Sequence, residues 1–211
     1  MASGLEAKRQ YGRSYFLTNS ILYFLVNRFS FRSTPIDDLV IVERAPLSDE
    51  RGYFERFFCS TNFEPILGNR SIQQINHNLT GKKGVLRGMH FQHPPHAELK
   101  LVSCLRGEVF DVAVDLRRGS KTFLQWHAEV LNETNHLTLC IPEGFAHGFL
   151  TLTHDCEMIY MHTADYSPDH EAGLNALDPR LAISWPAPIA ERSVRDRELA
   201  MLTPDFAGLS L

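Results

Sequence analysis

Histidine and cationic residues gather between residues 84 and 102. The stretch GVLRGMHFQHPPHAELKLV holds Arg87, His90, His93, His96, Glu98 and Lys100. Histidine titrates near neutral pH and is the side chain that most often serves as a general base. A nearby cation such as Lys100 or Arg87 can stabilise the negative charge that develops when a proton leaves the carbon beside a carbonyl group. The stretch is therefore a candidate site for proton abstraction.

Two later stretches add further polar groups. The segment IPEGFAHGF (141–149) places His147 after a glycine-containing turn, and EMIYMHTADYSP (157–168) contains Tyr160 and Tyr166. A tyrosine on the far side of a pocket can return a proton to the face opposite the base and so invert a stereocentre. These residues suit an epimerase, although their spacing alone does not identify one.

A catalytic metal is the competing interpretation of the same histidines. Metal-binding cupins use an HxH pair, a glutamate and a later histidine in a PxGxxH element. Pro142, Gly144 and His147 fit the later element. The first element is interrupted, because Gln92 follows His90 where a second imidazole is needed on the same face of a strand, and glutamine is a poor ligand beside imidazole. We therefore expect no metal.

The elements that carry these residues follow a β pattern. From residue 36 onward, short apolar or alternating runs are separated by turn signals. Phe110, Val112 and Val114 alternate with other residues in EVFDVAVDL, which is the period of a strand. The only plausible helix is STNFEPIL (60–67), and the tail after Trp185 is irregular. Many short strands without a βαβ rhythm predict a sandwich or barrel.

Composition limits the class of protein. A chain of 211 residues with 44% hydrophobic content can form one domain with its own core. Its formal net charge of −4 gives no basic excess for binding nucleic acid, so an anionic ligand requires a local cluster of arginine and lysine. Four separated cysteines without a CxxC pair indicate reduced thiols and a cytoplasmic protein.

The N-terminal part has a separate character. Residues 15–31 are mostly apolar and follow three basic residues, an order that imitates a signal peptide. Two asparagines and an arginine interrupt the run, which is too short to cross a membrane. We expect residues 1–35 to be a loosely ordered extension and residues 36–211 to form a single domain.

The chain resembles the dTDP-4-dehydrorhamnose 3,5-epimerase family, which comprises homodimeric, metal-free cupins of sugar-nucleotide pathways. The resemblance runs from about Leu39 to Asp196. Its blocks are DERGYFERFF (49–58), QIN (74–76), GVLRGMHFQ (84–92), KLV (100–102), RGEVFDVAVDLRRGS (106–120), IPEGFAHGF (141–149), IY (159–160), YSPDHE (166–171) and DPRLAISWP (178–186). It implies an all-β, cupin-type jelly-roll β-sandwich with a short irregular or helical C-terminal segment, and no cofactor.

The resemblance also implies roles for individual residues. His90 matches the proton-abstracting histidine, and Asp196 matches the carboxylate that orients its imidazole. Tyr160 matches the proton donor, and Lys100 matches the lysine near the developing oxyanion. Nucleotide- or sugar-contacting positions fall on Arg51, Gln74, Asn76, Arg87, His147, Glu171 and Arg195.

The implied partners are a nucleotide-sugar substrate, with dTDP as the expected nucleotide, and a second copy of the chain. Arg51 and Arg87 are expected to hold the diphosphate, since planar guanidinium groups suit phosphate oxygens. Aromatic residues of GYFERFF (52–58) are expected to stack on the base, in the site of the partner subunit. Strands near the N-terminus are expected to cross between the subunits of a C2 dimer.

Three departures from the family bear on the substrate. Arg56 stands where the family often has glutamate, Glu98-Leu99 replaces Gln-Gly, and Asp165 replaces a tyrosine. A mono-epimerase, a 3,4-ketoisomerase, a non-catalytic sugar-nucleotide-binding cupin and a metal-dependent cupin oxygenase remain alternatives. Seven further histidines are expected at the surface or in loops, namely His93, His96, His127, His136, His154, His162 and His170.

Overall fold

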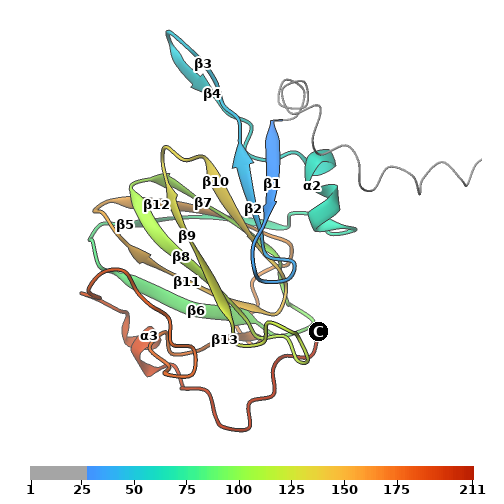
Figure 1. Cartoon of the computed structure of the whole chain (residues 1–211), viewed down its shortest axis with the longest axis vertical. Coiled ribbons are helices and arrows are strands. Elements are labelled where there is room, and N and C mark those ends of the chain that lie inside the picture. Colours follow the sequence, from blue (N-terminus) through green and yellow to red (C-terminus); the bar gives the residue numbers. More distant parts are fainter. Residues whose placement is uncertain (1–27) are drawn as a thin grey trace, which may run out of the picture.

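A computed structural model describes residues 28–211, which fold into two large antiparallel sheets and a small hairpin (Figure 1). The larger sheet contains, in spatial order, β1 (Phe29–Ser33), β2 (Val40–Arg44), β10 (Leu137–Ile141), β7 (Lys100–Arg106), β12 (Cys156–His162) and β5 (Gln74–Thr80). The smaller sheet contains β13 (Glu171–Gly173), β6 (Leu86–Gln92), β11 (Phe145–Thr151), β8 (Glu108–Asp115) and β9 (Trp126–Asn132). The all-β prediction is confirmed.

The core lies between the two sheets. Ile41, Val102 and Leu139 from the larger sheet pack against Val109 and Phe149 from the smaller one, and all five are almost fully buried. This packing is the reason that alternate positions of the strands are apolar. The four cysteines are free thiols, and all except Cys59 are buried.

The C-terminal segment covers the outer face of the smaller sheet. Leu174, Leu181 and Leu202 from this segment form a second apolar cluster with Val112 and Leu150 of the sheet. The smaller sheet is therefore buried on both faces, and every residue of β11 is buried. Phe110, Val112 and Val114 of β8 pack under this segment, and the intervening aspartates are also buried, on the face that looks toward the larger sheet.

Two helices lie within the described residues. The predicted helix STNFEPIL is α2 (Ser60–Leu67), and its Phe63 and Leu67 pack on the larger sheet against Val42 and Leu101. A short helix, α3 (Val194–Glu198), lies in the C-terminal segment and contacts β6. It begins at Ser193, whose hydroxyl oxygen accepts a hydrogen bond from the backbone N–H of Asp196.

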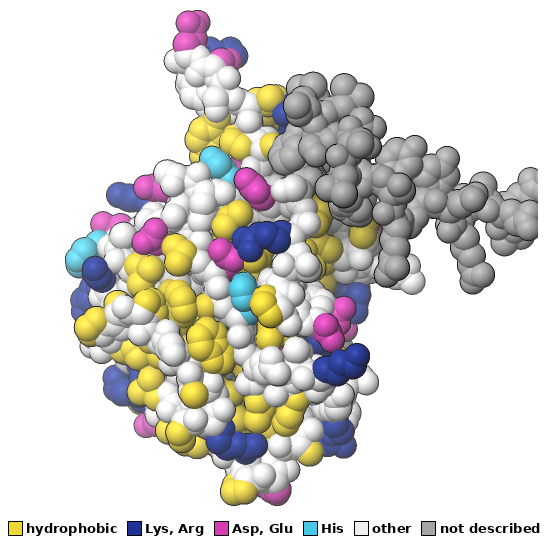
Figure 2. All heavy atoms as spheres, in the orientation of Figure 1, with side chains coloured by type: hydrophobic (Ala, Val, Ile, Leu, Met, Phe, Trp, Pro, Cys, Tyr) yellow, Lys and Arg dark blue, Asp and Glu magenta, His cyan; other side chains and the backbone are white. Residues whose placement is uncertain are grey.

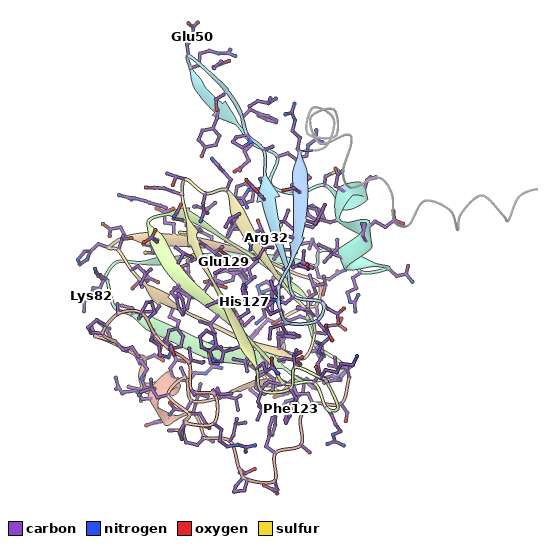
Figure 3. The ribbon with its side chains drawn as sticks, in the orientation of Figure 1. Arg32, Glu50, Lys82, Phe123, His127 and Glu129 are labelled. Atoms are coloured by element: carbon purple, nitrogen blue, oxygen red, sulfur yellow. The ribbon has the colours of Figure 1, made fainter. Side chains whose placement is uncertain are left out.

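A hairpin of β3 (Leu47–Asp49) and β4 (Gly52–Phe54) projects away from the sandwich (Figures 1 and 2). Glu50 lies at its tip (Figure 3). At its base, the buried guanidinium of Arg44 forms an ion pair with Glu55 at 2.9 Å and lies over the ring of Phe57. The hairpin is thus attached to the larger sheet through a buried charge pair, while Tyr53 near its tip is 60% exposed.

The extension predicted at residues 1–35 falls mostly outside the described residues, as does most of the apolar run at 15–31. Its described part includes β1, which pairs with β2 at the edge of the larger sheet. Within residues 28–211, no helix has the length and apolar character needed to span a membrane.

Candidate functional site

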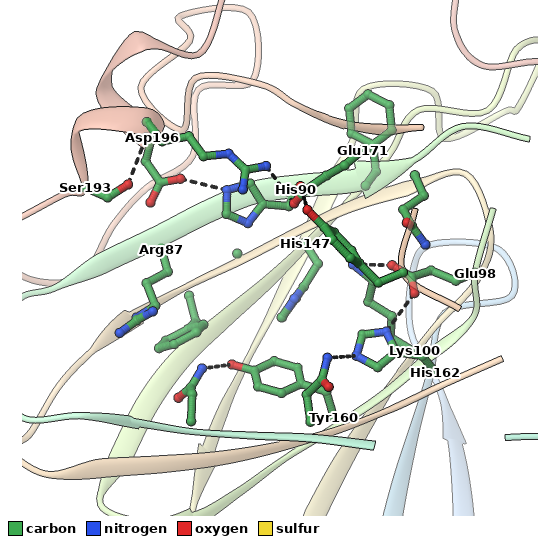
Figure 4. A pocket seen from close by; sticks show the side chains of 18 of the residues that line it. Arg87, His90, Glu98, Lys100, His147, Tyr160, His162, Glu171, Ser193 and Asp196 are labelled. Carbon is green, nitrogen blue, oxygen red and sulfur yellow. Dashed lines mark hydrogen bonds and ion pairs between the residues drawn. The ribbon is translucent and has the colours of Figure 1, made fainter. Parts of the chain in front are cut away.

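A cavity of about 540 Å³ opens between the two sheets at the end that carries α3 (Figure 4). Strands β6 and β11 form one wall, and β5, β7 and β12 form the other. All predicted site residues except Arg51 line this cavity. They are His90, Tyr160, Asp196, Lys100, Gln74, Asn76, Arg87, His147, Glu171 and Arg195.

His90 and Asp196 form a hydrogen-bonded pair in one wall. His90 Nε2 lies 2.7 Å from Asp196 Oδ1, and Asp196 is only 4% exposed. Burial raises the pKa of Asp196, but hydrogen bonds from His90, Ser193 and the backbone of Gly88 together hold it below its usual value. The carboxylate therefore stays ionised and fixes the proton of the neutral imidazole on Nε2. No described residue forms a hydrogen bond with the other ring nitrogen, Nδ1.

A second histidine–carboxylate pair lies next to the first. His147 is directly opposite His90 in the register of β11 and β6. Its Nε2 lies 2.9 and 3.0 Å from the two carboxylate oxygens of Asp111, which is fully buried. Asp111 was not among the predicted site residues. The sequence did carry a signal for it: Asp111 is an acidic residue within a mostly apolar strand, and a buried carboxylate requires a partner.

Tyr160 lies in the opposite wall, on β12 (Figure 4). Its phenol oxygen accepts a hydrogen bond of 2.9 Å from the Asn78 side-chain amide. Burial raises the pKa of Tyr160, and the nearby carboxylate of Asp111 raises it further. The phenol therefore remains protonated at neutral pH and can act as a proton donor.

Lys100 is held in the cavity wall by Glu98. The ammonium nitrogen lies 3.0 Å from Glu98 Oε1, and Glu98 Oε2 lies 2.7 Å from His162 Nδ1. The prediction that His162 is a surface or loop residue is wrong, because the residue is 8% exposed and lines the cavity. The signal was available: His162 follows Tyr160 by two positions on one strand, and such residues share a face.

The remaining polar groups differ in whether they already have partners. Glu171 accepts hydrogen bonds from Arg195 at 2.6 Å and from the Tyr166 hydroxyl at 2.7 Å. Gln74 donates a hydrogen bond of 3.1 Å to Asn76 Oδ1. No carboxylate among residues 28–211 pairs with Arg87, so its guanidinium is available at the mouth of the cavity to an anionic ligand.

Arg51 lies elsewhere in the protomer. It is on the projecting hairpin, where its guanidinium pairs with Asp49 at 2.5 Å and is exposed to solvent. The cavity of the same protomer does not include it. Gln92, which interrupts the HxH pair, binds loop backbone instead, through hydrogen bonds with His96 and Ser167.

Comparison with known proteins extends these findings. The model of a family described as dTDP-4-dehydrorhamnose 3,5-epimerase matches residues 33–204. The dTDP-4-dehydrorhamnose 3,5-epimerase of Salmonella typhimurium is 43% identical over 171 residues, which cover 80% of this chain and 93% of that protein. The enzyme of the same name from Escherichia coli is 45% identical over 154 residues, covering 72% and 83% of the two chains.

Solved structures agree with the sequence matches. A dTDP-6-deoxy-D-glucose-3,5-epimerase from Legionella pneumophila, in complex with dTDP-4-keto-L-rhamnose, has a TM-score of 0.78 and 41% identity, and the match covers 82% of this chain and 92% of that one. A 3′-monoepimerase from Streptomyces bikiniensis, in complex with dTDP-quinovose, has a TM-score of 0.74 and 30% identity, with coverage of 81% and 86%.

Proposed function

The chain belongs to the dTDP-4-dehydrorhamnose 3,5-epimerase family and is an isomerase, and we propose that it inverts C3 and C5 of a dTDP-linked 4-keto-6-deoxyhexose. One observation carries the proposal: a carboxylate-bound imidazole and a protonated phenol lie in opposite walls of one cavity, with an ammonium group in the same cavity. This set of groups suits removal of a proton from one face of a carbon and its return to the other.

In the proposed reaction, His90 is the base. The C4 ketone of the sugar acidifies the hydrogens at C3 and C5, and Nδ1 of His90 removes one of them. Asp196 keeps the proton of the neutral imidazole on Nε2 and stabilises the imidazolium that forms. General-base catalysis of this kind typically contributes about 10²- to 10⁴-fold to a rate.

Lys100 and Tyr160 complete the inversion. The Lys100 ammonium stabilises the enolate oxygen that forms when the proton leaves, because a fixed charge in a partly buried site is stronger than one in water. Tyr160 then donates its proton to the opposite face of the carbon. The environment that raises the pKa of Tyr160 keeps this proton in place until the enolate has formed.

Substrate binding requires groups from both ends of the cavity and from a second subunit. Arg87 binds the diphosphate, since its guanidinium has no carboxylate partner among the described residues. Gln74 and Asn76 offer amide groups to the nucleotide or the sugar. Arg51 and the exposed aromatic residues of the hairpin reach the cavity of a partner subunit in a C2 homodimer, because the hairpin projects away from the sandwich and Arg51 does not line the cavity of its own protomer.

Incubation with dTDP-4-keto-6-deoxyglucose in D₂O, followed by proton NMR, tests the reaction. Deuterium at both C3 and C5 of an inverted product supports the 3,5-epimerase. Deuterium at one carbon alone identifies a mono-epimerase, which the similarity to the Streptomyces bikiniensis enzyme makes the second candidate. Migration of the ketone to C3 identifies a ketoisomerase.

The non-catalytic alternative predicts binding of dTDP with no deuterium incorporation. A His90→Asn variant provides the matched comparison, because it removes the base and leaves the arginine residues intact. Loss of exchange with retained dTDP binding supports His90 as the base. Exchange at the rate of the unmodified protein would refute that assignment.

A further inference from the structure

Glu98 joins two side chains of the cavity wall that the proposed reaction does not otherwise connect. Its two carboxylate oxygens are divided between Lys100 at 3.0 Å and His162 at 2.7 Å. All three side chains are about nine-tenths buried. Among the described residues, Glu98 is the only carboxylate paired with Lys100, so it largely determines where the ammonium lies.

The hydrogen bonds around His162 fix its tautomer. Asn76 Oδ1 accepts a hydrogen bond from Gln74, so the Asn76 amide nitrogen faces His162 Nε2 at 3.4 Å. The Nε2 atom is then an acceptor, and the proton of the neutral ring lies on Nδ1. His162 therefore donates to Glu98 and prevents its carboxylate from rotating away from Lys100 (Figure 4).

A lysine needs such support more than most catalytic groups do. Its charge lies at the end of a flexible chain of four methylene groups. An ammonium group that samples many positions loses much of its stabilising effect on a developing oxyanion. Glu98 also departs from the glutamine that the resemblance leads one to expect at this position. This chain thus places a charged partner beside the lysine.

We propose that Glu98 and His162 are positioning residues: Glu98 holds the Lys100 ammonium at the place where the enolate oxygen forms, and His162 holds Glu98. The inference deepens the proposed function and rests on the role given there to Lys100. A purely structural ion pair is the alternative. The two differ in whether a change at Glu98 affects catalysis through Lys100.

A double-mutant cycle with Glu98→Gln and Lys100→Met in the full chain separates them. A glutamine at 98 has one oxygen for the two donors and carries no charge, so the lysine loses its fixed partner. We expect kcat to fall about 10- to 100-fold, as for a misplaced catalytic group, with KM changed by less than about threefold. Lys100→Met should lower kcat further, and adding Glu98→Gln to it should have no further effect.

Independent, multiplicative losses in the double variant would overturn the inference, since Glu98 would then act without Lys100. An unchanged kcat in Glu98→Gln, with a lowered kcat in Lys100→Met, would also overturn it while leaving the proposed function intact. Full activity in Lys100→Met would overturn both the inference and the oxyanion role that the proposed function gives to the lysine. Retained dTDP binding shows that each variant is folded.

A second pair of variants decides the matter if Glu98→Gln does not fold. His162→Asn keeps an N–H donor close to the position of Nδ1, whereas His162→Leu removes the donor and retains side-chain bulk. We expect kcat of His162→Asn to exceed that of His162→Leu by about 10-fold, and this difference to vanish when Lys100 is replaced by methionine. Equal kcat values for the two variants would contradict the inference.

Discussion

Replacing Asp196 by asparagine tests the proposed base more sharply than removing the base itself. The carboxylate of Asp196 accepts hydrogen bonds from His90 Nε2 at 2.7 Å, from the Ser193 hydroxyl and from the backbone of Gly88. Asparagine has nearly the same shape but offers one acceptor oxygen and one NH₂ group. The amide therefore cannot give all of these donors an acceptor, and at least one of them must face its NH₂ group.

The imidazole is the partner that adapts. The backbone N–H of Gly88 cannot give up its proton, whereas a neutral histidine can carry its proton on either nitrogen. The amide oxygen of the introduced asparagine thus turns to Gly88 and its NH₂ group to His90, so Nε2 becomes the acceptor. The imidazole proton then lies on Nδ1, the atom proposed to remove the substrate proton.

The expected loss follows from this tautomer. When the orienting aspartate of a serine protease triad is replaced by asparagine, the wrong tautomer lowers kcat by about 10⁴-fold, and we expect a similar loss here. If His90 kept its proton on Nε2, only the difference between a charged and a neutral hydrogen bond would be lost. That difference is about 1 to 2 kcal/mol, or roughly 5- to 30-fold in rate.

The assay is the rate of deuterium incorporation from D₂O at C3 and C5, measured by NMR under saturating substrate. Glu157→Gln is the matched control, because Glu157 forms the same kind of pair with His77 at 3.2 Å on an exposed surface outside the cavity. The control should exchange within about twofold of the unmodified protein. An Asp196→Asn rate reduced by less than about 30-fold would refute the tautomer argument.

Three further outcomes are expected. Tyr160→Phe should slow inversion by at least about 10²-fold but should slow the initial loss of the proton less. Deuterium incorporation without inversion of the carbon measures that initial loss, and an equal decrease in both rates would contradict the role of Tyr160 as proton donor. Arg87→Gln should raise the dissociation constant of dTDP about 10-fold or more, measured by calorimetry, while Arg106→Gln on the exposed surface should not change it. Burial raises the pKa of Glu98, but His162 and Lys100 hold it below its usual 4.5, so ionised Glu98 stabilises the fold above that pH. This stabilisation is lost as the pH falls through the lowered pKa. The difference in unfolding free energy between the unmodified protein and Glu98→Gln, from urea titrations, should therefore shrink below about pH 4.5; a constant difference would contradict the shift.

Much of the fold was predictable because local signals agree with it. Turn residues divide the chain into short runs, and the one segment with helical character, at 60–67, is α2. The predicted site residues lie far apart in the sequence, yet all except Arg51 line one cavity. We could assign these residues to one site because the motif blocks follow the order found in the family. The spacing of the residues alone is compatible with other kinds of enzyme.

The missed residues depend on strand register, which a single sequence does not reveal. Asp111 meets His147 because β8 and β11 are neighbours, and the two residues lie on one face of the sheet. Glu98 precedes β7 and meets His162 because β7 and β12 are paired. Polar side chains of this kind look like solvent-facing residues until their partners in adjacent strands are known.

The position of Asp196 has a consequence for how activity arises during synthesis. The segment that covers the outer face of the smaller sheet also carries the carboxylate that orients His90. All strands of the sandwich precede this segment in the chain. A nascent polypeptide can therefore complete both sheets on the ribosome while its proposed base still lacks an orienting partner. The same segment covers the last apolar surface of the smaller sheet, so we expect a chain that ends after β13 to be both inactive and prone to aggregate.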